Sequence, residues 1–171
     1  MTTYALRSLR LRPGEELREH VEIALEPFVL GGEAYLPVPA VTQADLTIQR
    51  TTSGDMFRLQ FATRLHGPCM RCLGDAALDV VTDAHEYQDE RPDDEEMSSE
   101  YVSDGQLDLS AWARDAVADA LPDQIVCRPE CAGLCPTCGR SLDDDPHEHE
   151  PDLQESPWSV LRALRDEIVE P

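Results

Sequence analysis

The chain has 171 residues, of which 41% are hydrophobic, and its 35 acidic residues outnumber its 14 basic residues to give a formal net charge of -21. This length allows one domain with a small appendage, and no run of about eighteen apolar residues suggests a membrane-spanning helix. Residues 1–12 lack the apolar stretch of a secretory signal, so we expect a cytoplasmic protein with no membrane contact.

Charge is distributed unevenly along the chain. Residues 1–72 contain eight Arg and eight acids, so the 27 acids and six Arg that follow carry the entire net charge. Without any Lys, the chain lacks the basic face of an autonomous nucleic-acid-binding protein, and any contact with RNA must be local. The arginines that could make it, unless they are ordinary solvated residues of strand faces, are Arg7, Arg10, Arg12, Arg58, Arg64 and Arg71.

Residues 1–87 are predicted to form a β-rich domain that contains the first Cys-x-x-Cys motif. Val21, Ile23 and Leu25 alternate with less apolar neighbours, as half-buried strands do. The same alternation over residues 45–65, interrupted by turn-forming residues at 51–55, predicts a β-hairpin. Residues 78–87 are rich in β-forming side chains, which places the first motif in a loop between two antiparallel strands.

The next two segments are expected to differ sharply in order. Residues 88–104 contain eight acids and almost no large apolar side chains, which predicts a mobile acidic linker. Within residues 105–125, apolar residues recur every three or four positions from Leu109 to Leu121, which predicts an amphipathic helix capped by Asp108 and stopped at Pro122. This helix should pack on the sheet, with Trp112 as a core side chain.

Residues 126–171 are predicted to form a Cys-rich zinc-binding tail that ends in a helix. Ser156 and Pro157 fit the start of that helix, and Trp158 begins an apolar stripe that must be buried on the body of the protein or on a partner. The predicted fold class is therefore α+β: a mainly antiparallel sheet, a packed amphipathic helix and a C-terminal tail stapled by zinc.

Zinc is predicted from the cysteine spacing. Two residues between thiols let both sulfur atoms of one tight turn face a single ion, and the Gly after the second motif permits a close approach of the backbone. Cytoplasmic thiols stay reduced, which favours metal over disulfides, and mostly thiolate coordination leaves no open position for metal-assisted hydrolysis. The candidate ligands are Cys69, Cys72, Cys127, Cys131, Cys135, Cys138, His147 and His149.

These eight residues allow two groupings that spacing does not separate. In the first, Cys69, Cys72, Cys127 and Cys131 bind one ion, while the second motif binds another ion together with His147 and His149. In the second, one ion is bound by the four cysteines of the two Cys-x-x-Cys motifs, and the two histidines lie in a solvated acidic run.

The order of these motifs resembles the bacterial YceD family of large ribosomal RNA subunit accumulation proteins. The resemblance rests on the first Cys-x-x-Cys motif after a strand, on Leu107-Asp108-Leu109 opening a helix that ends before Pro122, and on the run CRPECAGLCPTCG at residues 127–139. It departs from the family at His147-Glu148-His149, where relatives often have Cys-x-Cys, and at Ser156-Pro157-Trp158, where they have Asp-Pro-Arg.

The resemblance implies a noncatalytic role in the accumulation or maturation of large-subunit ribosomal RNA and in ribosome assembly. The expected partner is a basic ribosomal protein or a large-subunit assembly intermediate, with local ribosomal RNA contact through Arg and no small-molecule substrate. The alternative hypothesis is a zinc-thiolate redox sensor or adaptor protein. An enzyme is not expected, because no catalytic grouping or Gly-rich phosphate loop is visible.

Overall fold

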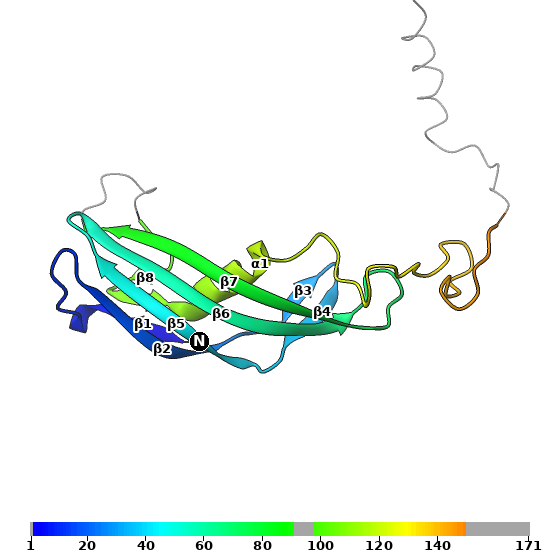
Figure 1. Cartoon of the computed structure of the whole chain (residues 1–171), viewed down its shortest axis with the longest axis horizontal. Coiled ribbons are helices and arrows are strands. Elements are labelled where there is room, and N and C mark those ends of the chain that lie inside the picture. The colour runs from blue at the N-terminus through cyan, green and yellow to red at the C-terminus, as the bar shows by residue number, and fades with distance from the viewer. Residues whose placement is uncertain (1, 91–97, 150–171) are drawn as a thin grey trace, which may run out of the picture. The chain divides into compact units, whose positions relative to one another are not determined.

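Antiparallel strands dominate the chain, as the alternation of apolar and polar residues predicts. The computed structural model describes residues 2–90 and 98–149 (Figure 1). The chain divides into two compact units, Met1–Gly133 and Leu134–Pro171. The expected α+β class is confirmed, because the described residues form a mainly antiparallel sheet structure with one α-helix.

The first unit is built on a six-stranded antiparallel sheet with β6 at its centre. Residues 55–61 of β6 pair with β5 and also with β7, so these two strands flank β6 on opposite sides. The order β2-β5-β6-β4-β3 describes the rest of the sheet. Its strands are β2 (Glu16–Ala24), β3 (Phe28–Leu30), β4 (Glu33–Pro37), β5 (Val41–Arg50), β6 (Gly54–Pro68) and β7 (Asp75–Asp89).

The predicted hairpin over residues 45–65 is confirmed as β5 and β6. Ile48 lies opposite Phe57, and the ladder ends where Arg50 pairs with Asp55. The turn is closed by a hydrogen bond of 2.8 Å from the Thr51 amide to the Gly54 carbonyl. Strands β6 and β7 then run side by side from Gly54–Asp89 to Pro68–Asp75, which places residues 69–74 in the loop between them, as predicted.

A second, three-stranded sheet joins the start of the chain to the segment before the helix. Its order is β1-β9-β8, with β1 at Thr3–Ala5, β8 at Val102–Ser103 and β9 at Gln106–Asp108, and the 3-10 helix η1 (Leu6–Ser8) follows β1. These strands were not predicted, because two or three residues are too few to show a period of two. Their contribution to the core is Leu107, which is fully buried.

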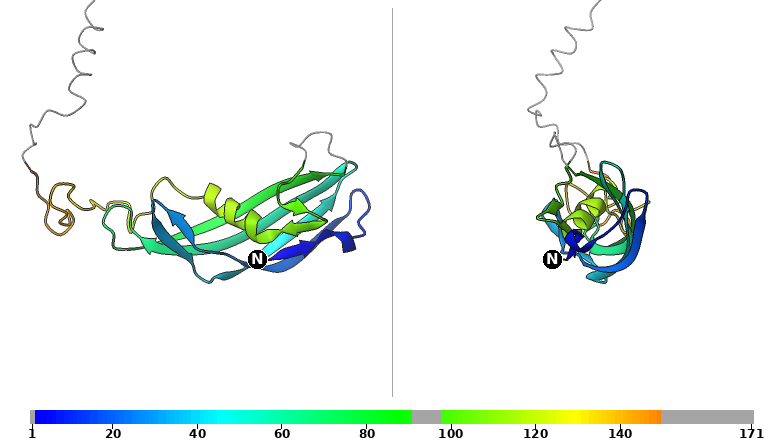
Figure 2. Two further views of the ribbon diagram at one scale, coloured as in Figure 1. Left: turned by 180° about the vertical axis from the view of Figure 1, so that it is seen from behind. Right: turned by 90° about the vertical axis from the view of Figure 1, so that its left-hand side faces the viewer.

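Helix α1 (Leu109–Asp119) forms where the apolar spacing predicts it. The Asp108 carboxylate caps its first turn by accepting a hydrogen bond of 3.0 Å from the Ala111 amide. The helix lies over one face of the sheet (Figure 2), where it contacts β7 and β2. Its apolar face is buried there, including Trp112, which is 2% exposed and is therefore a core side chain, as expected.

The predicted linker over residues 88–104 is wrong at both ends. Strand β7 continues through Asp89, and the segment from Ser99 onward forms a turn and then β8. Ser99 is 5% exposed, and the ring of Tyr101 stacks on Trp112 with centroids 6.3 Å apart. The many acidic residues of this segment led to the prediction of a mobile linker. The single aromatic ring of Tyr101 nevertheless packs the segment against the helix. Residues 91–97 lie outside the described residues.

The tail also begins later than predicted. Residues 126–133 belong to the first unit, because the main chain around Ile125 and Cys131 packs against the loop between β6 and β7. The predicted helix that starts at Ser156 lies outside the described residues. Within the described ranges, no helix is both long and apolar enough to span a bilayer.

Candidate metal centre

The loop between β6 and β7 forms a tight knuckle around the sulfur of Cys69. The Cys69 amide donates to the Gly74 carbonyl over 2.6 Å, and the Leu73 amide donates to the Cys69 carbonyl over 2.9 Å. Leu73 has a φ of 60°, a left-handed conformation that side chains other than Gly rarely adopt. The Arg71 amide lies 3.4 Å from the Cys69 sulfur and points a donor at it.

A distant segment is fixed against this knuckle through hydrogen bonds that its main-chain carbonyls accept. The Met70 amide donates to the Ile125 carbonyl over 2.9 Å, and the Arg71 guanidinium donates to the Cys131 carbonyl over 3.1 Å. Gly133 permits the close approach, because a Cβ atom there would lie 2.9 Å from the carbonyl oxygen of Arg71. These contacts bring Cys127 and Cys131 to the two cysteines of the loop.

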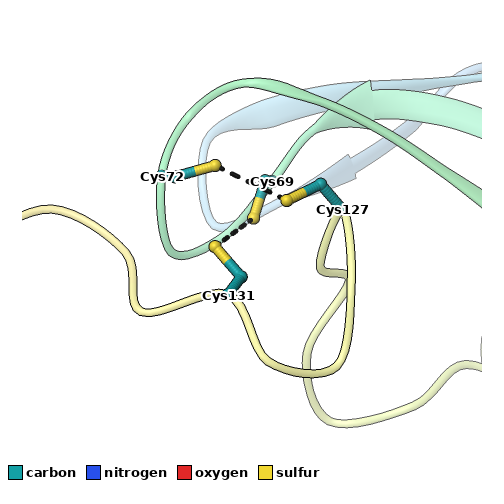
Figure 3. Close-up of side chains that lie close together, drawn as sticks. All are labelled: Cys69, Cys72, Cys127 and Cys131. Carbon is teal, nitrogen blue, oxygen red and sulfur yellow. Dashed lines mark hydrogen bonds between the residues drawn. The ribbon is translucent and has the colours of Figure 1, made fainter. Parts of the chain in front are cut away.

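The four sulfur atoms of Cys69, Cys72, Cys127 and Cys131 form a compact group that we call the four-cysteine group (Figure 3). The Cys69 and Cys131 sulfurs are 3.8 Å apart, the Cys72 and Cys127 sulfurs are 3.7 Å apart, and all four lie within 4.8 Å of one another. A disulfide needs about 2.05 Å. With zinc–sulfur bonds of about 2.3 Å, the edge of a tetrahedron is about 3.8 Å, so the group fits a zinc ion.

Burial and main-chain donors give these thiols different acidities. Burial raises the pKa of Cys69, but the amides of Cys72, Arg71 and Cys127 outweigh it and lower that pKa to about 6. Burial raises the pKa of Cys131 to about 12. The Cys69 and Cys131 sulfurs lie close enough to share a hydrogen bond, in which either could be the donor. Cys69 is fully buried and Cys131 is 2% exposed, whereas Cys127 is exposed, so a bound ion would be shielded from water on one side only. Four thiolate ligands would still leave it without an open ligand position.

The second unit holds another compact group, which we call the Cys2His2 group: Cys135, Cys138, His147 and His149. Their ligand atoms lie within 4.8 Å of one another. The Cys138 sulfur is 3.1 Å from Nε2 of His147, and the two imidazole rings meet edge to face with centroids 5.0 Å apart. This group is more open than the four-cysteine group, since Cys138 and His149 are exposed.

The protonation of His147 is fixed by its neighbours. Its Nδ1 lies 2.6 Å from the Asp145 carbonyl oxygen, which can only accept, so Nδ1 carries a proton and Nε2 faces Cys138. This hydrogen bond, followed by that with Cys138, raises the pKa of His147 to about 9. The Arg140 amide and then His149 lower the pKa of Cys138 to about 5. A thiolate and an oriented imidazole suit a zinc site with a carbonyl as outer partner.

The two knuckles share one backbone arrangement. The Gly139 amide donates to the Cys135 carbonyl, and the Cys135 amide to the Arg140 carbonyl, each over 2.8 Å, which repeats the bonding of Cys69 with Leu73 and Gly74. Gly139, with a φ of 72°, takes the position of Leu73. The reason predicted for this Gly was wrong, because a Cβ atom there would meet nothing within 4 Å. Positive φ, and not close approach, is what the turn requires.

The observed groups match the first of the two groupings that the sequence allowed. Each group lies inside a single unit and contains one Cys-x-x-Cys motif completed by residues that follow it in the chain. The compact groups do not support the alternative grouping, in which one ion is bound by two cysteines from each unit. That the groups bind zinc stays a prediction.

The arginines suggested for RNA contact are mostly engaged by other residues. Arg58 donates two hydrogen bonds to Asp83, and Arg64 donates two to Asp79, both across the exposed face of the sheet. Arg71 supports the four-cysteine group through the Cys131 carbonyl and Gln124. The other predicted positions, near η1, are Arg7, Arg10 and Arg12, and there the Arg10 guanidinium donates to the carbonyls of Arg7 and Leu9.

Two supporting residues of the four-cysteine group were missed by sequence analysis. The Tyr35 hydroxyl donates to the Pro68 carbonyl over 2.8 Å, directly before Cys69, while its ring is 1% exposed. Gly67 lies against that ring, where a Cβ atom would come within 2.4 Å of it. The Gly-Pro pair preceding the motif was a usable signal, because Gly inside a strand often marks a close approach.

Comparison with known families decides the relationship that the motifs suggested. A family model described as "Large ribosomal RNA subunit accumulation protein YceD" matches residues 57–165, which contain all eight candidate ligands. The chain belongs to the YceD family. The family match therefore includes most of β6, all of β7 and α1, and both ligand groups.

Relatives in mycobacteria share most of this length. Uncharacterized proteins of Mycobacterium bovis and Mycobacterium tuberculosis are each 33% identical over 155 residues, which cover 86% of this chain and 74% of the relative. An uncharacterized protein of Mycobacterium leprae is 35% identical over 96 residues, which cover 53% of this chain and 43% of the relative. No solved structure gives a significant match.

Proposed function

We propose that this protein is a noncatalytic factor, active in the cytoplasm, that supports the accumulation of large-subunit ribosomal RNA during ribosome assembly. The observation that carries the proposal is the match to the YceD family over residues 57–165. The site chemistry agrees with a noncatalytic role, because four thiolates around one ion, two of them buried, leave no ligand position for a substrate.

Zinc is the metal proposed for both ligand groups. Thiolate and imidazole ligands at tetrahedral spacing suit Zn²⁺, and a structural ion contributes directly to folding. In the four-cysteine group it would join the loop between β6 and β7 to the segment that follows α1. In the Cys2His2 group it would hold the second knuckle against His147 and His149.

The partner proposed is a basic ribosomal protein or a large-subunit assembly intermediate. The 27 acids that follow residue 72 create a long-range field that attracts basic surfaces and accelerates encounter. We expect this association to weaken steeply with salt. Neutralising Asp93, Asp94, Glu95 and Glu96 should slow it, whereas neutralising four exposed acids of the balanced first part should change it less; that control set is Glu16, Glu22, Glu26 and Glu33.

The proposal is tested by the ratio of large-subunit to small-subunit ribosomal RNA in cells depleted of the protein. We expect the ratio to fall, and to recover when the wild-type chain is supplied. A Cys69→Ser chain, which removes a buried ligand, should rescue poorly. The control is a chain with the substitution Ser103→Ala at an exposed position, which should rescue fully. An unchanged ratio on depletion would contradict the proposed function and leave the zinc sites to be judged separately.

The redox alternative has less support from the geometry. A thioredoxin-like motif needs its first thiol at the start of a helix that follows a strand. Here the first motif lies in a hairpin loop, and the second lies in a turn closed by the bridge between Leu134 and Ser141. Release of zinc from the intact chain at low peroxide concentration would favour the redox hypothesis over the structural one.

A further inference from the structure

The outer edge of β7 is open to a further strand. Although β7 is 15 residues long, it pairs with β6 alone within the described part of the chain. In an antiparallel edge strand, alternate residues direct their N–H and C=O groups away from the neighbouring strand. In the described structure, residues 81–84 make no main-chain hydrogen bond beyond the β6 ladder.

A groove of about 250 Å³ runs beside this edge, between β7 and α1. Four consecutive residues of β7, 81–84, line one side, which shows that the strand presents its edge to the groove and not only one face. The helix contributes Ala116 and Asp119 to the other side, together with its C-cap residue Ala120. Two of these three side chains end at Cβ, so the helix leaves room beside the strand for an extended main chain.

We infer that the groove between β7 and α1 binds an extended, basic peptide segment, which adds to the sheet as a strand antiparallel or parallel to β7. Main-chain hydrogen bonds to a strand edge supply the affinity in this mode of recognition, and alternate side chains of the peptide supply the specificity. At about 3.3 Å per residue, a segment of four to six residues spans the four β7 residues that line the groove.

Charge selects the occupant. Strand β7 carries five acids and no Arg, and Asp83 and Asp119 line the groove from its two sides, with no basic side chain in the lining. Arg58 and Arg64 of β6 offset two of the five charges through Asp83 and Asp79. Two copies of this edge would repel each other, so the charges oppose self-association and favour Lys and Arg in the incoming segment.

The inference rests on the proposed function for the natural source of the peptide, which would be a basic segment of a ribosomal protein. The groove itself depends only on the fold. Binding can therefore be tested with a synthetic probe and the full-length chain, independently of the ribosomal RNA ratio.

The probe is a nine-residue peptide in which Lys or Arg alternates with Val, added to the full chain during nuclear magnetic resonance measurements. We expect shift changes centred on residues 81–84 and cross-strand contacts between the peptide and β7. Two control peptides accompany this probe. The first keeps the side chains but is N-methylated at alternate residues, which removes main-chain donors. The second keeps the length but replaces each basic residue by Glu, which reverses the charge. Since a net hydrogen bond is worth about fivefold in affinity, loss of two should weaken binding roughly 25-fold.

Two helix variants provide the matched comparison. Ala116→Trp fills the groove and should weaken binding at least tenfold, whereas Ala118→Trp, at an exposed position of the same helix outside the groove, should leave it unchanged. Failure of the basic probe to bind, equal binding of the N-methylated or acidic probe, or equal effects of the two Trp variants would overturn the inference. The N-methylated probe keeps the test decisive if Ala116→Trp does not fold. If the peptide fails to bind but depletion still lowers the ratio of large-subunit to small-subunit ribosomal RNA, the peptide-binding inference is rejected and the proposed function is retained.

Discussion

Removing one ligand from each group in turn distinguishes two zinc ions from one. We expect the wild-type chain to bind two zinc ions. Cys69→Ser should remove one ion from the four-cysteine group, and Cys138→Ser should remove the other from the Cys2His2 group. Because the groups lie in separate units, only the first substitution should destabilise Met1–Gly133.

The size of the effect follows from linkage. An ion that binds only the folded state, at a free concentration of a thousand times its dissociation constant, stabilises that state by about 4 kcal/mol. A unit of the length of Met1–Gly133 has an unfolding entropy of about 0.28 kcal/mol/K, on the basis of about 2.1 cal/mol/K per residue. Loss of the ion from the four-cysteine group should therefore lower the melting temperature of this unit by about 14 °C.

Trp112 supplies the assay. The chain has two Trp residues, so a Trp158→Phe background leaves Trp112, on the buried face of α1, as the reporter of the first unit. Zinc content would be measured by elemental analysis, and melting would be followed by Trp112 fluorescence with and without a chelator. The chelator provides the same comparison without a substitution at the fully buried position of Cys69.

Two results would refute the reasoning. A wild-type chain with one zinc ion, which either Ser substitution abolishes, would support the single-ion grouping. Equal lowering of the Trp112 transition by Cys69→Ser and Cys138→Ser would show that the groups are not energetically separate.

Two further substitutions test how the first knuckle is held. Leu73→Gly should stabilise the first unit by about 1 kcal/mol in chemical denaturation, because it relieves a φ of 60° at a side chain that is 63% exposed, whereas Leu73→Ala, which keeps the Cβ atom, should bring no such gain. Gly67→Ala should destabilise the unit by about 1–3 kcal/mol, because the added Cβ atom overpacks against the Tyr35 ring. A smaller destabilisation in a Tyr35→Leu background would confirm that this ring is the obstacle. Equal destabilisation in both backgrounds would exclude the ring as the cause.

Long elements were predictable because each carries its own signal. The hairpin of β5 and β6 has alternating residues and a polar turn, and α1 has both a cap at Asp108 and a stop at Pro122. The loop position of Cys69 follows once strands are placed on both sides of it. Short strands such as β8 carry no period, and their residues are ordered by neighbours far away in the sequence, as Tyr101 is by Trp112.

The partition of the eight ligands could not be predicted for a similar reason. Motif spacing fixes which two thiols share a knuckle, but it does not say which other segment reaches them. That depends on the hydrogen bonds that the Met70 amide donates to the Ile125 carbonyl and that the Arg71 guanidinium donates to the Cys131 carbonyl. The residues that make these contacts have no recognisable pattern, since the donors and acceptors are mostly backbone groups.

The two ligand groups differ in how much chain must close before they exist. The Cys2His2 group draws all its ligands from residues 135–149, and the paired Cys138 and His147 are only nine positions apart. In the four-cysteine group, Cys69 and Cys131 are 62 positions apart. Loop closure over such a distance carries a larger entropic cost unless the sheet and α1 have already formed. During synthesis, the Cys2His2 group could therefore load its ion from a short stretch of chain, whereas the four-cysteine group would be completed only on a folded scaffold.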